Sequence, residues 1–273
     1  MKFIDKTLNQ VNGNQLVDAF LNNRWSIVDN RYYNFNYSTH PTHPFKWSLR
    51  TPLRTLLLHE QSNYCCYCMR LINANRMTFE HVVPQSTITL VELNHYTHHP
   101  IIAQNVCLQS DFESARVQKN TPPYPLQIAY ENLTASCDGE LPDGTTKRTC
   151  NCKRGNNFVE PLFYISTIED DITYGHGGLM HSSNSLHNTS ISTLNLNYSL
   201  LQKIRQVWHH ISAENIDDIE NAHTELERMT ILTINLMGLP SVTRNSLIAD
   251  FKTELFWRAL LQYKWFYSYY NKP

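Results

Sequence analysis

Apolar residues recur at helical spacing in the second half of the chain. One run repeats at intervals of four, three and four residues, at Leu200, Ile204, Val207 and Ile211. Because this spacing places the side chains on one face, it predicts an amphipathic helix, which Asn197 or Ser199 can cap. We expect two more helices after it, one near residues 222–237 and a last one that extends over residues 247–263 in a strongly aromatic strip.

Periodic segments in the first half are shorter. Residues 15–22 form a helical candidate, and Thr51 with Pro52 supplies an N-cap and a first-turn proline for a leucine-rich helix. Residues 87–129 contain scattered histidines and prolines, so we expect mostly loop there. An alternating apolar stretch that includes two glycines, at residues 165–178, predicts a small strand pair.

These patterns divide the chain into three parts. We expect a helical and loop segment at residues 1–44, a compact domain at residues 45–165 with an insertion at about residues 87–129, and a mainly helical region at residues 166–273. The predicted fold class is therefore α+β, with a small mixed domain embedded in a largely helical chain. The aromatic residues near the carboxy terminus fit either a partner-binding surface or a core.

The composition is typical of a folded globular protein, and the net charge limits nucleic-acid binding to local surfaces. Hydrophobic residues make up 41% and charged residues 17% of the 273 residues. The formal net charge of -1 gives no overall attraction to phosphate, so any phosphate-binding surface must be local. Basic residues do gather locally, at Lys147, Arg148, Lys153 and Arg154.

The cysteines point to metal binding rather than to disulfides. The polar beginning MKFIDKTLNQ is not a secretory signal, and no later run is apolar enough to span a membrane, so we expect a cytoplasmic location. In that reducing compartment the seven cysteines do not predict a disulfide framework.

Two thiol pairs can supply a tetrahedral zinc site. We expect the ligands to be Cys65, Cys68, Cys137 and Cys150. Two Asp-Gly pairs at residues 138–146 predict a hairpin turn that brings the last two thiols together. Cys66 and Cys152 lie next to these positions and could replace one of the ligands. A redox dithiol at the Cys-x-x-Cys pair is the alternative interpretation.

Three histidines, His95, His98 and His99, form a further cluster in the sequence. They lie in a proline-containing segment, and Glu92 is the only nearby carboxylate at ligand spacing. We therefore expect a structural role for them.

The order of the motifs carries a family resemblance. Cys-x-x-Cys, Glu-His-x-x-Pro, Asn-Leu-x-x-x-Cys and Cys-Asn-x-x-Arg-Gly follow one another over residues 65–155. This set resembles the HNH endonuclease family, whose core is a ββα-metal finger. The continuation NNFVEPLF, ITYGHGGLM and STLNLNYSLLQKIRQ is similar to the HNH proteins of retrons and of the Septu (PtuB) anti-phage system. The resemblance spans roughly residues 50–210 and implies a zinc-stabilised ββα-metal core.

The resemblance also implies a role for each polar residue of the motifs. His81 would be the general base that takes a proton from the attacking water, and Asn132 would orient its imidazole through a hydrogen bond. Glu80 and Asn151 would hold one magnesium or manganese ion, which stabilises charge on the scissile phosphate. These assignments describe a metal-dependent hydrolysis of phosphodiester bonds.

Two basic residues, Lys153 and Arg154, follow the last motif. By the same resemblance they would hold flanking phosphates, and a solvated helix face is the alternative for both. Products with a 5′-phosphate are expected.

Partners are implied by the resemblance alone. In that family the HNH protein works beside an ABC/SMC-like ATPase of PtuA type, and a retron reverse transcriptase with its msDNA can join them. We expect DNA as the substrate, with RNA such as transfer RNA as the alternative, because no segment resembles a groove-reading helix. A zinc-stabilised adaptor without catalytic activity is the alternative from another class.

Overall fold

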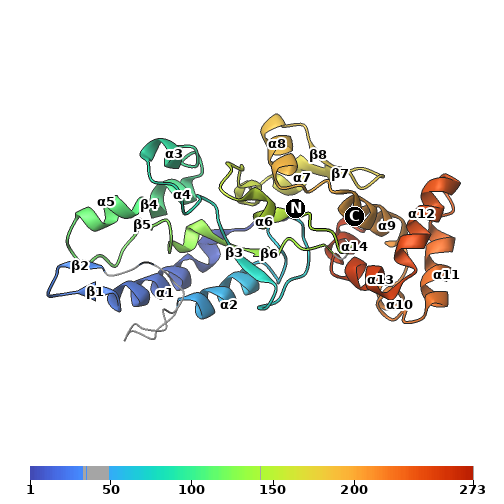
Figure 1. The fold of residues 1–273 in the computed structure, drawn as a ribbon, viewed down its shortest axis with the longest axis horizontal. Helices are drawn as coiled ribbons and strands as arrows, with labels where there is room; N and C mark the ends of the chain where they lie inside the picture. Colours follow the sequence, from blue (N-terminus) through green and yellow to red (C-terminus); the bar gives the residue numbers. More distant parts are fainter. Residues whose placement is uncertain (33–34, 36–48, 142, 273) are drawn as a thin grey trace.

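The computed structural model describes residues 1–32, 35, 49–141 and 143–272, and it forms an elongated body (Figure 1). Residues 33–34, 36–48, 142 and 273 lie outside this description, and with them most of the loop predicted within residues 1–44. The amino terminus lies near the middle of the body, and the chain ends beside α14. Among the described residues, no helix combines the length and the apolar character needed to cross a bilayer.

The amino-terminal part consists of helices that pack on the centre of the molecule. Its elements are η1 (Lys6–Asn9), α1 (Gln10–Asn22), the antiparallel strands β1 (Trp25–Ser26) and β2 (Arg31–Tyr32), and α2 (Arg50–Glu60). The helix predicted at residues 15–22 is the second half of α1, which buries Val17, Phe20 and Leu21. Helix α2 buries Leu53 and Leu57, which are four residues apart and so share one face.

The central sheet has two antiparallel strands, β3 (Met77–His81) and β6 (Leu133–Cys137). Its register pairs Met77 with Cys137 at one end and His81 with Leu133 at the other. The ladder therefore has a cysteine end and a histidine end. The helix α6 (Cys150–Arg154) follows β6 along the chain and lies beside this sheet (Figure 1).

The insertion between β3 and β6 is more ordered than the sequence predicts. It contains α3 (Leu90–Asn94), α4 (Pro100–Asn105), β4 (Val106–Cys107), α5 (Gln109–Ser114), β5 (Tyr124–Pro125) and η2 (Tyr130–Asn132). Helices and strands take up 21 of residues 87–129, so about half of this segment is loop as expected, and local capping defines the short helices. Thr89 and Glu92 form a capping box for α3, and Pro100 starts α4.

The segment after α6 leads from the central sheet to the carboxy-terminal helices. It contains η3 (Leu162–Tyr164), α7 (Ile168–Asp171), β7 (Ile172–Tyr174), β8 (Met180–Ser182) and α8 (Ser185–Thr193). The antiparallel pairing of β7 with β8 confirms the predicted strand pair. Its turn holds Gly178 at a φ of +76°, and a Cβ there would lie 1.9 Å from the Gln202 carbonyl oxygen, so only glycine fits.

The carboxy-terminal part is a helical bundle at one end of the body (Figure 1). It contains α9 (Ser199–Ile211), α10 (Ile216–Glu220), α11 (Glu225–Asn235), α12 (Ser241–Phe251), α13 (Glu254–Leu261) and α14 (Trp265–Tyr270). The amphipathic helix predicted from the spacing is confirmed as α9.

The single last helix predicted at residues 247–263 is divided between α12 and α13. Thr253 has an extended backbone and precedes α13, so the chain turns there.

The aromatic residues of this region pack inside the bundle. The indole nitrogens of Trp208 and Trp257 donate to the carbonyls of Leu260 and Ile219, at 3.0 and 3.2 Å. Of the aromatic residues in this strip, Phe251, Trp257, Tyr263 and Phe266 are buried, and Phe256 and Trp265 are partly buried. Most of the aromatic strip is therefore core.

Candidate functional site

The four predicted zinc ligands come together at the cysteine end of the central sheet. Cys65, Cys68, Cys137 and Cys150 are all buried, and their sulfur atoms lie within 4.8 Å of one another. The Sγ atoms of Cys65 and Cys150 are 3.9 Å apart, and those of Cys68 and Cys137 are 3.8 Å apart. Four converging thiols could hold a metal ion such as zinc.

Backbone geometry explains why these four sulfurs meet and the neighbouring ones stay outside. Cys65 and Cys68 sit in a tight turn in which the Met69 amide donates to the Cys65 carbonyl at 3.2 Å. The Cys137 amide donates to Sγ of Cys65 at 3.3 Å, as backbone amides commonly do towards thiolates. Cys152 is exposed on α6 and does not join the group.

Cys66 was the other candidate replacement ligand, and it points elsewhere. Its sulfur accepts a hydrogen bond from the Thr134 hydroxyl at 3.6 Å, and it is not part of the four-thiol group.

Cys150 has a φ of +56°, which is uncommon for a residue with a side chain. Such a conformation persists when its surroundings impose it, and here the Cys150 amide donates to the Leu194 carbonyl at 3.0 Å.

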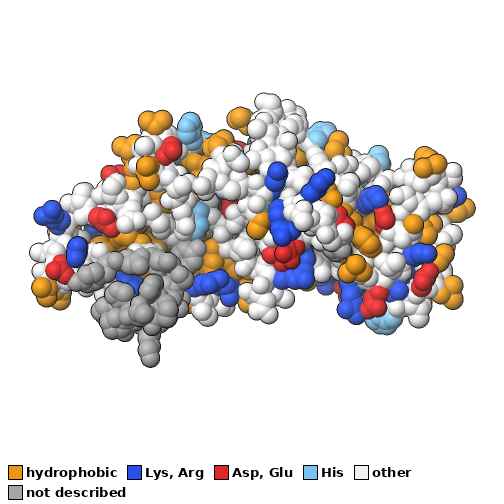
Figure 2. Space-filling view, in the orientation of Figure 1, with side chains coloured by type: hydrophobic (Ala, Val, Ile, Leu, Met, Phe, Trp, Pro, Cys, Tyr) orange, Lys and Arg blue, Asp and Glu red, His pale blue; other side chains and the backbone are white. Residues whose placement is uncertain are grey.

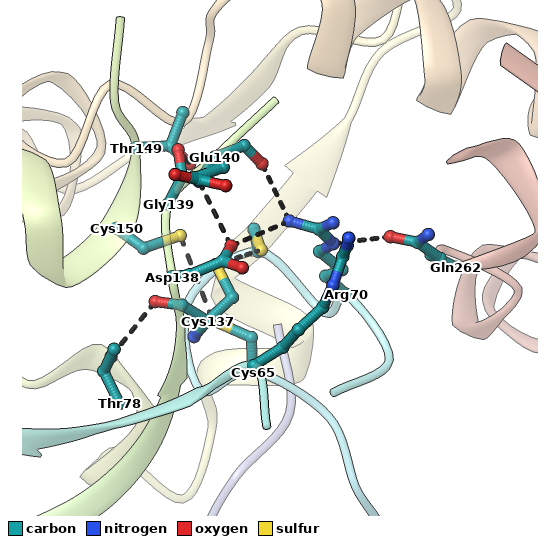
Figure 3. A network of polar contacts seen from close by, with 12 residues as sticks. Cys65, Arg70, Thr78, Cys137, Asp138, Gly139, Glu140, Thr149, Cys150 and Gln262 are labelled. Atoms are coloured by element: carbon teal, nitrogen blue, oxygen red, sulfur yellow. Dashed lines mark hydrogen bonds and ion pairs between the residues drawn. The ribbon is translucent and has the colours of Figure 1, made fainter. Parts of the chain in front are cut away.

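The loop between β6 and α6 closes over the thiols (Figure 3). The Thr149 amide donates to the Gly139 carbonyl at 3.2 Å, which brings the two ends of the loop together. The described part of this loop contains no strand, so the predicted hairpin is a closed loop rather than a ladder. A Cβ on Gly139 would lie 2.5 Å from the Thr149 carbonyl oxygen, and its φ is +68°, so glycine is required for the closure.

Arg70 ties this loop to the carboxy-terminal helices (Figure 3). Its guanidinium donates to Oδ1 of Asp138 at 3.1 Å and to the Glu140 carbonyl at 2.7 Å. Its Nε donates to the Gln262 side chain at 2.7 Å. Because the Arg70 side chain is 5% exposed and used internally, it is not available to a flanking phosphate.

At the histidine end of the sheet, a buried ion pair joins β3 to α6. The Glu80 carboxylate accepts from Arg154 and from the Tyr67 hydroxyl, the latter at 2.7 Å. The Arg154 guanidinium also donates to the carbonyls of His81 and Val82, at 2.7 and 2.6 Å. Burial raises the pKa of Glu80, while the Arg154 guanidinium and the Tyr67 hydroxyl act in the opposite direction.

These contacts correct the prediction that Arg154 holds a flanking phosphate. The side chain is 2% exposed, and its donors are directed at Glu80, at backbone carbonyls and at the Tyr96 hydroxyl, 3.3 Å away. Burial lowers the pKa of Arg154, but the negative charge of neighbours such as Glu80 outweighs it and raises the pKa, so the guanidinium is charged. Lys153 is exposed on the same helix, and its role in phosphate binding stays a prediction.

His81 lies at the end of β3 and is partly buried. Its Nε2 lies 3.2 Å from the Gln127 carbonyl and 2.9 Å from Nε2 of Gln85. A carbonyl only accepts and calls for a proton on Nε2, whereas the Gln85 amide nitrogen only donates and calls for the lone pair there, so the two contacts favour opposite tautomers of His81. Burial lowers the pKa of His81 to about 4, so the ring is neutral at neutral pH.

Asn132 was expected to orient the imidazole, and its amide is used differently. Its Oδ1 accepts from the Val83 amide at 2.7 Å, and its Nδ2 donates to the carbonyls of Val83 and Leu126, at 3.0 and 2.7 Å. The side chain is fully buried and holds the chain that leaves β3 against the start of β6. Asn132 therefore positions the His81 segment through the backbone, and the Gln127 carbonyl contacts the ring.

Asn151 lies against β3 and contacts the residue that precedes Glu80. Its Nδ2 donates to the Phe79 carbonyl at 3.1 Å, which leaves Oδ1 as the ligand atom. Within the described ranges, neither this oxygen nor Oε2 of Glu80 accepts a hydrogen bond. Two such oxygens fit magnesium or manganese in chemistry, but Arg154 already neutralises Glu80, so the protein alone offers little net charge to the ion.

Three contacts around the site were not predicted from the sequence. The Tyr67 hydroxyl reaches Glu80, the Gln127 carbonyl reaches His81, and the ion pair of Glu80 with Arg154 links two motifs. Tyr67 and the Gln127 carbonyl could not be predicted, because a tyrosine between two cysteines and a backbone carbonyl are common features. The ion pair of Glu80 with Arg154 could have been predicted, because these two motif residues carry opposite charges.

Comparison of the chain with protein-family models, with curated proteins and with solved structures yields no match. The residues of the site and the order of the motifs are therefore what indicates a function.

Proposed function

We propose that the protein is a metal-dependent endonuclease of the HNH type, which hydrolyses phosphodiester bonds of nucleic acid with DNA as the favoured substrate. One observation carries the proposal. A two-stranded ladder followed by a short helix has a four-thiol cluster at one end and Glu80 and His81 at the other, and Asn151 of the helix contacts the middle of β3. This is the order that a zinc-stabilised ββα-metal core requires, with segments separated by up to 85 residues joined in one unit.

The chemistry proposed for His81 follows from the neutral state of its ring. A neutral imidazole carries a lone pair on one ring nitrogen, which would accept a proton from a water molecule while the water oxygen attacks phosphorus. The bond to the 3′ oxygen breaks in line, and the product keeps a 5′-phosphate. A neutral ring is required at the start, which agrees with the lowered pKa of His81.

The divalent ion would be held by Oε2 of Glu80 and Oδ1 of Asn151, completed by water and substrate oxygens. It would supply charge stabilisation at the phosphate and the leaving oxygen. Because Arg154 pairs with Glu80, we expect the ion to bind weakly without substrate and more tightly when a phosphate adds its own negative charge.

Basic side chains near the site can contact the phosphates of a nucleic-acid backbone. Lysine and arginine side chains gather near the middle of one face, over α6 and the loop that precedes it (Figure 2). Of the residues predicted there, Lys147 and Lys153 are exposed. Phosphate contacts of this kind position a substrate without reading its sequence, so RNA is kept as the alternative substrate.

Partners are proposed from the motif resemblance alone. We propose that the protein acts beside an ABC/SMC-like ATPase of PtuA type in anti-phage defence, with a retron reverse transcriptase and its msDNA as further partners. A non-catalytic zinc-stabilised adaptor is the second candidate function. The internal ion pair of Glu80 with Arg154 favours it, because a carboxylate satisfied by an arginine is not poised for a metal.

The test is cleavage of DNA and of structured RNA by wild type and by His81→Ala, with magnesium or manganese and with the ATPase present. We expect the variant to lose about 10²–10⁴-fold in rate while its zinc content and unfolding temperature stay close to wild type. His95→Ala is the matched control, because this exposed histidine lies outside the site. Equal rates for His81→Ala and wild type would reject His81 as the base, and absence of cleavage in all variants would favour the adaptor.

A further inference from the structure

Two histidines and one glutamate meet outside the thiol cluster. Nε2 of His98 lies 2.8 Å, and Nε2 of His99 lies 2.7 Å, from the same atom, Oε1 of Glu160. The three ligand atoms lie within 4.8 Å of one another. Histidines from the insertion and a glutamate from the segment after α6 thus converge on one point, although 61 residues separate His99 from Glu160.

We propose that His98, His99 and Glu160 bind a divalent first-row transition-metal ion, with zinc the best fit, at a site separate from the four thiols. Two imidazole nitrogens and one carboxylate oxygen suit zinc and its neighbours, whereas magnesium and calcium take oxygen ligands. Three protein ligands leave a fourth position for water. This proposal does not depend on the proposed nuclease activity.

The spacing of the ligand atoms is compatible with a metal ion after a small movement. Tetrahedral zinc with bonds of about 2.0–2.1 Å separates its ligand atoms by roughly 3.3–3.4 Å. The two nitrogen–oxygen distances are therefore shorter than the tetrahedral value by roughly 0.6 Å. The His98 side chain is 52% exposed and can adjust its own distance without disturbing the core, and a small rotation of the Glu160 carboxylate would have to lengthen the distance to His99.

The other two ligands are held in place by the backbone. The His99 carbonyl accepts from the Ile102 and Ala103 amides, both at 3.0 Å, at the start of α4. The Glu160 amide donates to the Ser190 hydroxyl on α8, also at 3.0 Å. Both side chains are 8% exposed. Two fixed ligands and one adjustable ligand make a site that needs little ordering when the ion binds.

Charge gives a further reason for an ion at this position. The Glu160 carboxylate is nearly buried, and in the described part of the chain its ion-pair partners are the two histidines alone. A carboxylate buried in this way is stabilised by positive charge placed beside it. A divalent ion held by the two rings would supply the charge directly.

The proposed ion would fix the insertion near the candidate catalytic residues. The His99 amide donates to the Tyr96 carbonyl at 3.1 Å, and the Tyr96 hydroxyl contacts Arg154. Phe158, two residues before Glu160, packs its ring 5.1 Å from that of Tyr96. A metal bond between the two segments would thus hold Tyr96 over Arg154.

Metal stoichiometry tests the proposal without an activity assay. The full-length protein is stripped of metal under reducing conditions, loaded with cobalt(II) or zinc(II) alone, and freed of excess by dialysis. Wild type is compared with Glu160→Gln, which keeps an acceptor for both imidazoles but removes the charge, and with His98→Gln at the exposed ligand. His95→Ala is the control, because it lies in the same segment and outside the cluster.

We expect wild type and His95→Ala to bind two ions per chain, and Glu160→Gln and His98→Gln to bind one. With cobalt(II), the ion lost should be the one without thiolate charge-transfer absorption, and the thiolate signal should remain in all four proteins. The proposal is overturned if all four proteins bind the same number of ions, or if wild type binds a thiolate-bound ion only.

Discussion

Replacing Arg154 by methionine distinguishes a structural arginine from a phosphate-binding one. The substitution keeps much of the aliphatic volume but removes the partner of the buried Glu80 carboxylate and the donors to the His81 and Val82 carbonyls. Breaking a buried ion pair by removing one partner costs about 3–5 kcal/mol. A cost of this size corresponds to a fall of roughly 10 °C in the unfolding temperature for a chain of this length.

The assay is urea unfolding and thermal unfolding of the zinc-loaded protein at neutral pH. Lys153→Met is the matched control, because the preceding residue on the same helix is exposed and should change stability by less than about 0.5 kcal/mol. The double variant Glu80→Gln with Arg154→Met should recover part of the loss, since the unpaired charge is gone. A cost below about 1 kcal/mol for Arg154→Met would refute the account of Arg154 as the residue that joins β3 to α6.

The remaining predictions concern the metal, the loop and the base. Cys65→Ser should abolish binding of the thiolate-bound ion and unfold the surrounding segments, since such an ion contributes on the order of 10 kcal/mol; Cys152→Ser, at an exposed thiol, should keep full zinc content by atomic emission. Asn132→Ala should cost about 2–4 kcal/mol in urea unfolding, because a backbone amide and two carbonyls lose their partner, and an unchanged midpoint would contradict this. The pKa of His81 is lowered to about 4, so the neutral base is present above that pH, and cleavage should persist as pH falls through the ordinary histidine range; a rate that halves near pH 6.5 would count against the buried ring.

The four converging thiols could be predicted because thiol chemistry is specific and few residue types share it. The spacing of Cys65 and Cys68 is typical of metal ligands, and the order of the motifs adds Cys137 and Cys150 to the set. The choice against Cys66 and Cys152 required coordinates, because adjacent thiols differ only in where the backbone directs them. Helix α9 was predictable for a similar reason, since one face buries a regular set of apolar residues.

Other features depend on contacts that sequence spacing does not encode. Glu160 joins His98 and His99 from a distant segment, so the sequence suggested that these histidines lacked a carboxylate. Arg154 looks like a phosphate ligand in the sequence and is an internal counter-ion in the structure. A charged residue acquires its role from its surroundings.

The insertion is different, because its helices did have a signal. The pattern Thr-x-x-Glu at Thr89 and Glu92 is a capping box, and Pro100 is a common first residue of a helix. Both were outweighed by the scattered histidines and prolines of the segment. The division between α12 and α13 likewise follows Thr253, a residue type that often precedes a helix.

The central claim is that four cysteines from three separate segments bind one ion and so join the turn at residues 65–68 to β6 and α6. Zinc K-edge X-ray absorption of the Glu160→Gln variant tests it most directly, since that substitution removes the proposed histidine site from the signal. We predict a single shell of four sulfur atoms at about 2.3 Å. A shell that contains nitrogen or oxygen ligands, or fewer than four sulfurs, would contradict the claim.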